Sequence, residues 1–366
     1  MADLPLSALR DYLGSLEKRN VEIVYVGGLQ QPKRTKLVGK LKGFGYGTPY
    51  LIEYRVGRKV KSGVLETMRP GGFGHDFPWD RAQSLLFAHR TYDRLPKHVR
   101  SIDVGILTKK SELRSVGDFS EFFLLTEKVQ GQGYYKDLER IRDSGVMTDM
   151  DEKRCTVLSE YIARVHKVKK KAPELYVRAV RDLVGHGECI MGLVDSYPKE
   201  ADFLQKDELK EIEKKCVDWR WKLKSKSRSL CRVHGDFHPF NIMFRKGIEF
   251  TALDRSRSEW GEPADDVASM SINYLLFSIQ THDKLVSPFD QLYELFMRTY
   301  LDRTGDEELL EVIQPFYVWR SLVVASPIWY PNLGRDNRRR FFNFIRAVLD
   351  TDRFDVKAIN SYLGHA

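Results

Sequence analysis

Cysteine is scarce in this chain, and the spacing of the few cysteines excludes two kinds of site. The four cysteines are Cys155, Cys189, Cys216 and Cys231, and no two of them form a Cys-x-x-Cys pair. Neither a thiolate zinc site nor a dithiol redox motif is therefore predicted. Isolated, reduced thiols are typical of the cytoplasm, so we expect a cytoplasmic protein.

Long apolar runs are also lacking. Residues 1–11 contain no basic region followed by an apolar stretch, so no signal peptide is predicted. No segment has the length of apolar sequence that a membrane-spanning helix requires. We therefore expect no membrane partner.

The sequence has basic runs but no recognisable nucleic-acid motif within them. The runs at residues 167–171, 222–226 and 338–340 are without interleaved aromatic residues and are most simply solvated helix faces or helix ends. The net charge of +9 favours anionic partners such as nucleotide phosphates, although it equally suits weak, non-specific contact with nucleic acid. No specific nucleic-acid partner is predicted, and the oligomeric state stays open.

The 366 residues exceed what a single hydrophobic core usually serves, so two domains are expected. Alternating apolar patterns such as residues 21–26 predict strands in the first third, after an opening helix with Leu9, Leu13 and Leu16 at helical spacing. Helical patterns dominate later, for example the helix that ends near His166. The sequence thus predicts an α+β protein with a β-rich region at 1–130 and a mainly helical region at 131–366.

One short segment concentrates the side chains of a phosphoryl-transfer site. Asp236 and Asn241 stand five positions apart in a loop, and Asp254 follows Asn241 by thirteen positions. Two apolar strands and a Gly-containing turn fill the interval, so we expect a hairpin that brings Asn241 and Asp254 side by side. Mg²⁺ prefers such oxygen ligands and takes the rest from phosphates and water. These spacings match the catalytic Asp, the Mg²⁺-binding Asn and the second metal-binding Asp of kinase-type transfer.

The run His234-Gly235-Asp236-Phe237-His238-Pro239-Phe240-Asn241, followed by residues 253–268, resembles the aminoglycoside phosphotransferase and choline kinase family. The resemblance implies a bilobal protein-kinase-like fold that uses ATP and Mg²⁺, with residues 1–130 as the nucleotide-binding lobe and residues 131–366 as the catalytic and substrate-binding lobe. It implies that Asp236 is the catalytic base and that Asn241 and Asp254 are the metal ligands. Support of the catalytic loop falls to His234 and Asp266, and His238 lies in the loop within reach of a substrate. Asp266 could alternatively serve only as the N-cap of the helix that follows.

The resemblance also places the nucleotide. A glycine-rich hairpin tip at Gly43, Gly45 and Gly47 lies where backbone amides would cover the phosphates, although such glycines are also ordinary turn formers. An apolar strand at 121–129 runs into a glycine-rich connector, where backbone groups near Glu127 and Val129 would meet the adenine. In the family, a Lys on the strand that corresponds to residues 59–70 contacts the donor phosphates.

Position 66 departs from the family pattern, because Glu66 stands where that Lys is expected. A carboxylate repels triphosphate oxygens. Lys61, Lys59 or Arg69 could serve instead, or the nucleotide could sit differently or not bind. The nucleotide-binding set that we predict is Gly43, Gly45, Gly47, Lys61, Glu127 and Val129.

The predicted function is ATP- and Mg²⁺-dependent phosphorylation of a hydroxyl on a small molecule. Two alternatives stay open because of Glu66: a pseudokinase that binds or regulates without turnover, and transfer of a nucleotidyl group on the same fold. The acceptor is not identified, but Arg335 and the arginines at 338–340 make a cationic acceptor less suitable.

Overall fold

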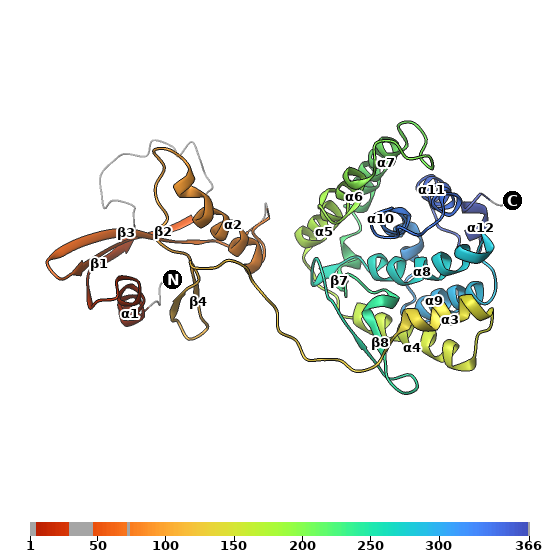
Figure 1. The fold of residues 1–366 in the computed structure, drawn as a ribbon, viewed down its shortest axis with the longest axis horizontal. Coiled ribbons are helices and arrows are strands. Elements are labelled where there is room, and N and C mark those ends of the chain that lie inside the picture. Colours follow the sequence, from red (N-terminus) through yellow and green to blue (C-terminus); the bar gives the residue numbers. More distant parts are fainter. Residues whose placement is uncertain (1–4, 29–46, 72–73, 365–366) are drawn as a thin grey trace. The chain divides into compact units, whose positions relative to one another are not determined.

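The computed structural model describes residues 5–28, 47–71 and 74–364 of the chain. It divides into two compact units, Met1–Thr126 and Glu127–Ala366 (Figure 1). Strands form the centre of the first unit and helices most of the second, so the predicted α+β class is confirmed. The roles predicted for the two regions, nucleotide binding and catalysis, stay predictions.

The N-terminal unit is built on a three-stranded antiparallel sheet in the order β1-β2-β3. The helix α1 packs beside β1 and contributes Leu9 and Leu13 to a small core with Val21, Ile52 and Tyr54. The predicted opening helix and first strand are therefore confirmed. The elements of this unit are α1 (Leu6–Glu17), β1 (Val21–Gly28), β2 (Gly47–Val56), β3 (Lys59–Met68), α2 (Pro78–Thr91), β4 (Gly105–Leu107) and β5 (Leu113–Ser115).

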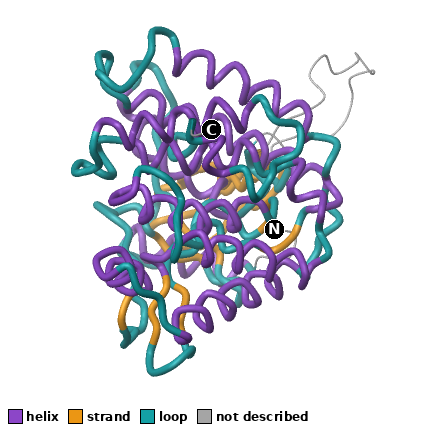
Figure 2. Tube along the Cα trace, turned by 90° about the vertical axis from the view of Figure 1, so that its right-hand side faces the viewer, coloured by secondary structure: helices purple, strands orange, loops and turns teal. Residues whose placement is uncertain are grey.

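The C-terminal unit is a helical assembly around one buried helix. Almost every side chain of α8 (Ala264–His282) up to Ile279 is buried, and α8 packs against α3, α9 and α10. Figure 2, with helices in purple, shows how much of this unit is helical. The other helices are α3 (Tyr134–Ser144), α4 (Asp149–His166), α5 (Pro173–Gly185), α6 (Ile190–Ser196), α7 (Glu208–Leu223), α9 (Phe289–Thr304), α10 (Gln314–Ala325), α11 (Arg335–Leu349) and α12 (Ile359–Tyr362).

Two small sheets position the loops of this unit. β8 (Ile242–Phe244) and β9 (Phe250–Ala252) form the predicted hairpin, and β6 (Gln132–Gly133) pairs with β8. β7 (Cys231–Arg232) pairs with β10 (Trp260–Gly261). Because β7 leads into the Asp236 loop and β10 leads out of the Asp254 segment, this pairing brings the ends of both loops together.

The strand predicted at 121–129 is wrong, because residues 120–130 form neither strand nor helix. An apolar run is stable as a strand when a neighbouring strand pairs with it and its side chains are buried. Here Phe123, Leu124 and Leu125 are each at least 87% exposed, and the unit boundary falls between Thr126 and Glu127. The run is the connection between the two units.

The cysteines are all buried and unpaired. Burial raises the pKa of the Cys155 and Cys189 thiols to about 12, so both stay protonated at neutral pH. Across the described part of the chain, we find no helix that combines the length and the apolar character needed to cross a bilayer.

Candidate active site

The loop that carries Asp236 is held in a conformation that only glycine permits at position 235. Gly235 has φ +83°, and a Cβ atom placed there would lie 2.4 Å from the carbonyl oxygen of Ser256. The Asp236 loop and the 254–258 loop therefore approach each other at backbone contact distance. Two segments that are twenty residues apart become neighbouring walls of one site.

Asp266, on α8, holds this loop through hydrogen bonds to the loop backbone. Its Oδ2 accepts hydrogen bonds from the backbone N–H of His234 (2.7 Å) and from His166 Nε2 (3.1 Å), and its Oδ1 accepts from the N–H of Gly235 (2.8 Å). Burial opposes ionisation of this fully buried carboxyl, but these donors outweigh it and keep the pKa of Asp266 below its ordinary value. Asp266 is the third residue of α8, and its carboxylate contacts the loop, so it is not the N-cap. Burial lowers the pKa of His234, which favours a neutral ring.

Asn241 and Asp254 are brought together by the hairpin. Ile242 pairs with Ala252, and the N–H of Leu253 donates to the carbonyl of Asn241 at 2.8 Å, so Asp254 follows directly at the end of β9. Asn241 Nδ2 donates to the carbonyl and to Oδ2 of Asp236, at 3.0 and 3.1 Å. Its amide oxygen is consequently turned away from Asp236.

This pair of oxygen ligands suits a magnesium ion. Asp254 is exposed, and its backbone has φ +48°, a left-handed conformation that Asp tolerates better than most residues. Within the described residues no three His, Cys, Asp or Glu side chains gather into a metal site. Two protein ligands are nevertheless enough for Mg²⁺, which draws the remainder from phosphates and water.

The Asp236 carboxylate lies at the centre of a charged cluster. Oδ1 accepts from Arg320 Nη1 at 2.9 Å, and Arg257 Nη2 lies 3.6 Å away, while Oδ2 lies 3.3 Å from His238 Nε2. Burial disfavours the carboxylate, but the hydrogen bond from His238 and the two guanidinium charges hold the pKa of Asp236 well below its usual range. Asp236 is therefore ionised at any physiological pH.

Neither Arg320 nor Arg257 was assigned to the site from the sequence. Arg320 lies on α10 and also donates from Nη2 to Asp265 Oδ1 at 2.8 Å. Its side chain is 8% exposed. A single charge within the otherwise uncharged run Val318-Trp319-Arg320-Ser321-Leu322 is the signal that could have identified it, because a lone buried cation requires a partner.

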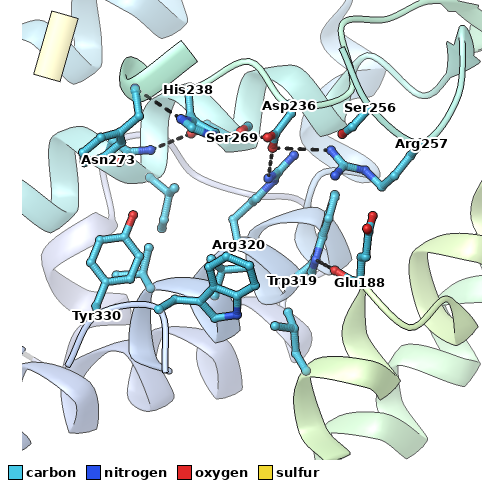
Figure 3. A pocket seen from close by; sticks show the side chains of 16 residues that line it. Glu188, Asp236, His238, Ser256, Arg257, Ser269, Asn273, Trp319, Arg320 and Tyr330 are labelled. Carbon is cyan, nitrogen blue, oxygen red and sulfur yellow. Dashed lines mark hydrogen bonds and ion pairs between the residues drawn. The ribbon is translucent and has the colours of Figure 1, made fainter. Parts of the chain in front are cut away.

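A cavity of about 500 Å³ opens beside Asp236, within the C-terminal unit. Figure 3 shows the guanidinium groups of Arg320 and Arg257 both directed at Asp236. Asn241 and Asp254 are not among its lining residues, so the predicted metal ligands lie outside the cavity lining. His238, the predicted substrate contact, does line it. The lining is Glu188, Leu193, Asp236, His238, Phe240, Ser256, Arg257, Ser269, Ile272, Asn273, Trp319, Arg320, Val323, Val324, Trp329 and Tyr330.

The predicted nucleotide contacts are only partly described. Gly43 and Gly45 lie outside the described residues, and Gly47 begins β2. Glu127 and Val129 lie in the segment without secondary structure that begins the second unit.

Lys61 lies on the opposite face of β3 from Glu66. The register of β3 with β2 is unbroken, so odd and even positions point to opposite faces. Lys61 Nζ makes an ion pair with Glu17 Oε2 of α1 at 2.7 Å. Glu66 is exposed and contributes to a cavity of about 660 Å³ in the N-terminal unit. Lys59 shares the face of Lys61, so β3 supplies no cation on the Glu66 face.

The arginines of α11 do not line the cavity beside Asp236. Arg338 donates to the backbone carbonyls of Ala325 and Tyr330, and Arg339 makes an ion pair with Glu208. Arg335 and Arg340 pair with Asp202 and Asp283 on the surface. These side chains hold the helical unit together. The positive charge that makes a cationic acceptor less suitable is instead that of Arg257 and Arg320, which line the cavity.

Comparison with known proteins assigns the family. The model of a family described as "Phosphotransferase enzyme family" matches residues 76–305, more than half of the chain. No curated protein matches the sequence.

Solved structures give weaker likenesses. Glucosamine kinase is 16% identical over 64% of this chain and 57% of its own, with a TM-score of 0.36. The chain thus spans less than three fifths of that enzyme. Amicoumacin kinase, solved with AMP-PNP, Ca²⁺ and Ami, is 16% identical over 96% of this chain and 98% of its own, with a TM-score of 0.40. The macrolide 2'-phosphotransferase of Brachybacterium faecium is 13% identical over 97% of this chain and 100% of its own, with a TM-score of 0.32.

Proposed function

The chain belongs to the phosphotransferase enzyme family, and from this premise we propose that it transfers the γ-phosphoryl group of ATP to a hydroxyl of a small molecule. The observation that carries the proposal is the connected set of Asp236, Asn241 and Asp254. Each has a fixed place relative to the others through the hairpin and the Asn241–Asp236 hydrogen bonds. This arrangement corresponds to the parts that phosphoryl transfer needs.

Asp236 would receive the acceptor hydroxyl in the cavity. The hydroxyl oxygen attacks the γ-phosphorus, the bond from that phosphorus to the bridging oxygen of ADP breaks, and the hydroxyl proton passes to the Asp236 carboxylate. The lowered pKa of Asp236 makes it a weak base. A weak base suffices because the transition state is loose, with little bonding to the nucleophile, so that orientation contributes most of the acceleration.

Asn241 Oδ1 and the Asp254 carboxylate would hold Mg²⁺. When bound, the ion neutralises charge on the phosphate oxygens. Asp266, His166 and His234 would act only by holding the loop. His238 is placed to contact the acceptor, since it lines the cavity and borders Asp236.

A non-catalytic, pseudokinase-type role is the second candidate, and it has one specific observation in its favour. Glu66 stands on a face of β3 that carries no cation. Whether a nucleotide binds is therefore the decisive question.

Calorimetric titration of ATP with and without Mg²⁺ tests both. Metal-dependent binding that weakens at least about tenfold in Asp254→Ala is expected, because charge-assisted contacts of this kind are worth about 1.5–3 kcal/mol. Asp352→Ala is the matched control, since Asp352 is fully exposed and pairs only with Lys222 on the surface. Absence of ATP binding under either condition would refute the transferase and favour the pseudokinase.

A further inference from the structure

The cavity beside Asp236 contains buried polar groups that the proposed reaction does not use. Arg257 Nε and Nη2 and Arg320 Nε are buried and have no hydrogen-bond partner among the described residues. Such groups are rare in native structures, because a buried N–H without an acceptor is costly. Three guanidinium nitrogens without acceptors in one cavity indicate a site for a ligand with several acceptor oxygens.

Arg257 has the larger unused capacity of the two arginines. Arg320 is occupied by Asp236 and Asp265 at 2.9 and 2.8 Å, whereas Arg257 approaches the same two oxygens only at 3.6 and 4.0 Å. Arg257 also adopts φ +62°, a left-handed backbone that residues with a Cβ seldom occupy. The chain therefore tolerates an unfavourable conformation at the residue that presents this guanidinium.

Both guanidinium groups lie against the ring of Trp319. Their Cζ atoms are 4.3 Å (Arg257) and 3.9 Å (Arg320) from the ring centroid. Stacking on the indole fixes the planes of the two guanidinium groups, and the Nε–Nη2 edge of Arg257 has no hydrogen-bond partner among the described residues. A planar guanidinium edge is the group best suited to bind a carboxylate or phosphate through two parallel hydrogen bonds.

Two further orphan groups lie on α8 in the same cavity. Ser269 Oγ and Asn273 Oδ1 are buried without a partner among the described residues, and the two side chains are 1% and 4% exposed as residues. Asn273 Nδ2 donates to the Ser269 carbonyl at 2.8 Å, which fixes the amide with its oxygen free. In Figure 3, Asn273 lies on the other side of Asp236 from Arg257. These groups match the hydroxyls of a polyhydroxylated ligand.

Acidic groups offer little to a cationic ligand here. Besides Asp236, Glu188 is the acidic residue in the lining, and it is exposed. Asp236 and its neighbour Asp265 are already paired with Arg320.

We propose that the acceptor is an anionic polyol, a hydroxylated molecule whose carboxylate or phosphate binds Arg257 and Arg320 while Ser269 and Asn273 bind its hydroxyls. This inference rests on the proposed function for its reaction. The anion site itself exists in the free protein and does not require a nucleotide.

The test therefore measures binding of small probes without nucleotide, by calorimetry at constant ionic strength. Four probes share one carbon skeleton and differ in charge: D-glycerate, glycerol 3-phosphate, glycerol and 3-amino-1,2-propanediol. We expect saturable binding of at least one anion, with the neutral and cationic probes at least tenfold weaker. The stronger of the two anions shows whether the site takes a carboxylate or a phosphate.

Arg257→Gln is the informative variant, because Arg257 makes no short ion pair whose loss would unfold the loop. It should weaken the preferred anion at least tenfold, and Arg257→Lys should restore part of the affinity. Arg335→Gln, an exposed arginine outside the cavity, should change nothing. Equal affinity for glycerol or the amine, no saturable anion binding, or an unchanged Arg257→Gln variant would each overturn the inference.

A donor-phosphate role for the arginines is distinguished in the same experiment. If Arg257→Gln weakens ATP and not the anionic probes, the guanidinium serves the transferred phosphate and the inference is overturned. If the wild-type protein binds an anionic probe but no ATP, the proposed transferase alone is refuted.

Discussion

Replacement of Asp266 by Asn gives the sharpest test of how the Asp236 loop is held. The wild-type carboxylate accepts from Gly235 N–H on one oxygen and from His234 N–H and His166 on the other, all between 2.7 and 3.1 Å. Asn offers one acceptor and one donor. Whichever way the amide is turned, at least one backbone N–H loses its acceptor and the new NH₂ has none, so at least two buried donor groups are left unsatisfied.

Each unsatisfied buried group costs about 1–3 kcal/mol, so two of them give a destabilisation of about 2–6 kcal/mol for Asp266→Asn. For a unit of the size of Glu127–Ala366 this lowers Tm by roughly 4–24 °C. Thermal unfolding followed by tryptophan fluorescence measures it, because most of the tryptophans lie in this unit. No substrate is needed.

Asp350→Asn is the matched control, since Asp350 makes an exposed ion pair with Lys215. Such a pair is worth about 0–1 kcal/mol. If Asp266→Asn shifted Tm no more than this control, the loop would not depend on the buried carboxylate and the description of the site would be wrong.

Three other substitutions test neighbouring features. Gly235→Ala should lower the free energy of unfolding by at least about 1–2 kcal/mol because of the left-handed backbone alone, and by more because the new Cβ would contact Ser256. Gly247→Ala is the control in chemical denaturation, since Gly247 has φ +70° but open space around it. Equal losses of stability in the two variants would contradict the close approach of the loops at Gly235. Burial raises the pKa of Glu262 from 4.5 to about 7, so the folded protein binds more protons than the unfolded chain in this window. Its stability should therefore fall by roughly 3 kcal/mol as the pH rises from 4.5 to 8, and Glu262→Gln should lack this fall when Tm is measured across the range. Parallel pH profiles of the two proteins would contradict the raised pKa of Glu262. Arg154→Ala removes a guanidinium that donates to two carbonyls of the β8–β9 hairpin and pairs with a carboxylate on α3. It should lower the free energy of unfolding, measured by urea denaturation, by about 3–5 kcal/mol. Arg303→Ala on the surface is the control, and an equally small effect of the two substitutions would be the contrary result.

The part of the site that lies within one stretch of sequence could be predicted from it. Asn241 and Asp254 are joined by a hairpin, and hairpin pairing follows from strand patterns and a turn. The sequence pattern therefore predicted the hairpin that connects the two residues. Their chemical roles still depend on ligands and remain proposals.

Contacts between distant segments could not be obtained this way. Arg320 reaches Asp236 across 84 positions, and the approach depends on how α10 packs beside α8. Periodicity identifies α10 as a buried helix but does not say which neighbour its one charge meets. The cavity and its orphan polar groups became visible only with that packing.

The apolar run before residue 126 shows the opposite failure. Leu124 and Leu125 have the composition of a buried strand, yet they join two units and are exposed. An apolar composition shows that a segment is suited to burial, whereas strand pairing and burial themselves depend on partners elsewhere in the chain. Position 66 is similar, because only the register of β3 with β2 establishes that Lys61 and Glu66 lie on opposite faces of the strand.

The contacts of Asp266 also bear on how the chain matures. Asp266 lies on α8, and its partners come from α4 and from the Asp236 loop, with separations of 100 and about 30 residues. Contacts of such separation close large loops, which cost entropy before they contribute to stability. The Asp236 loop should thus become ordered after most of α4 and α8 have docked. A nascent chain released before residue 266 has been made would contain the whole His234–Asn241 motif and still lack the carboxylate that gives this loop its shape.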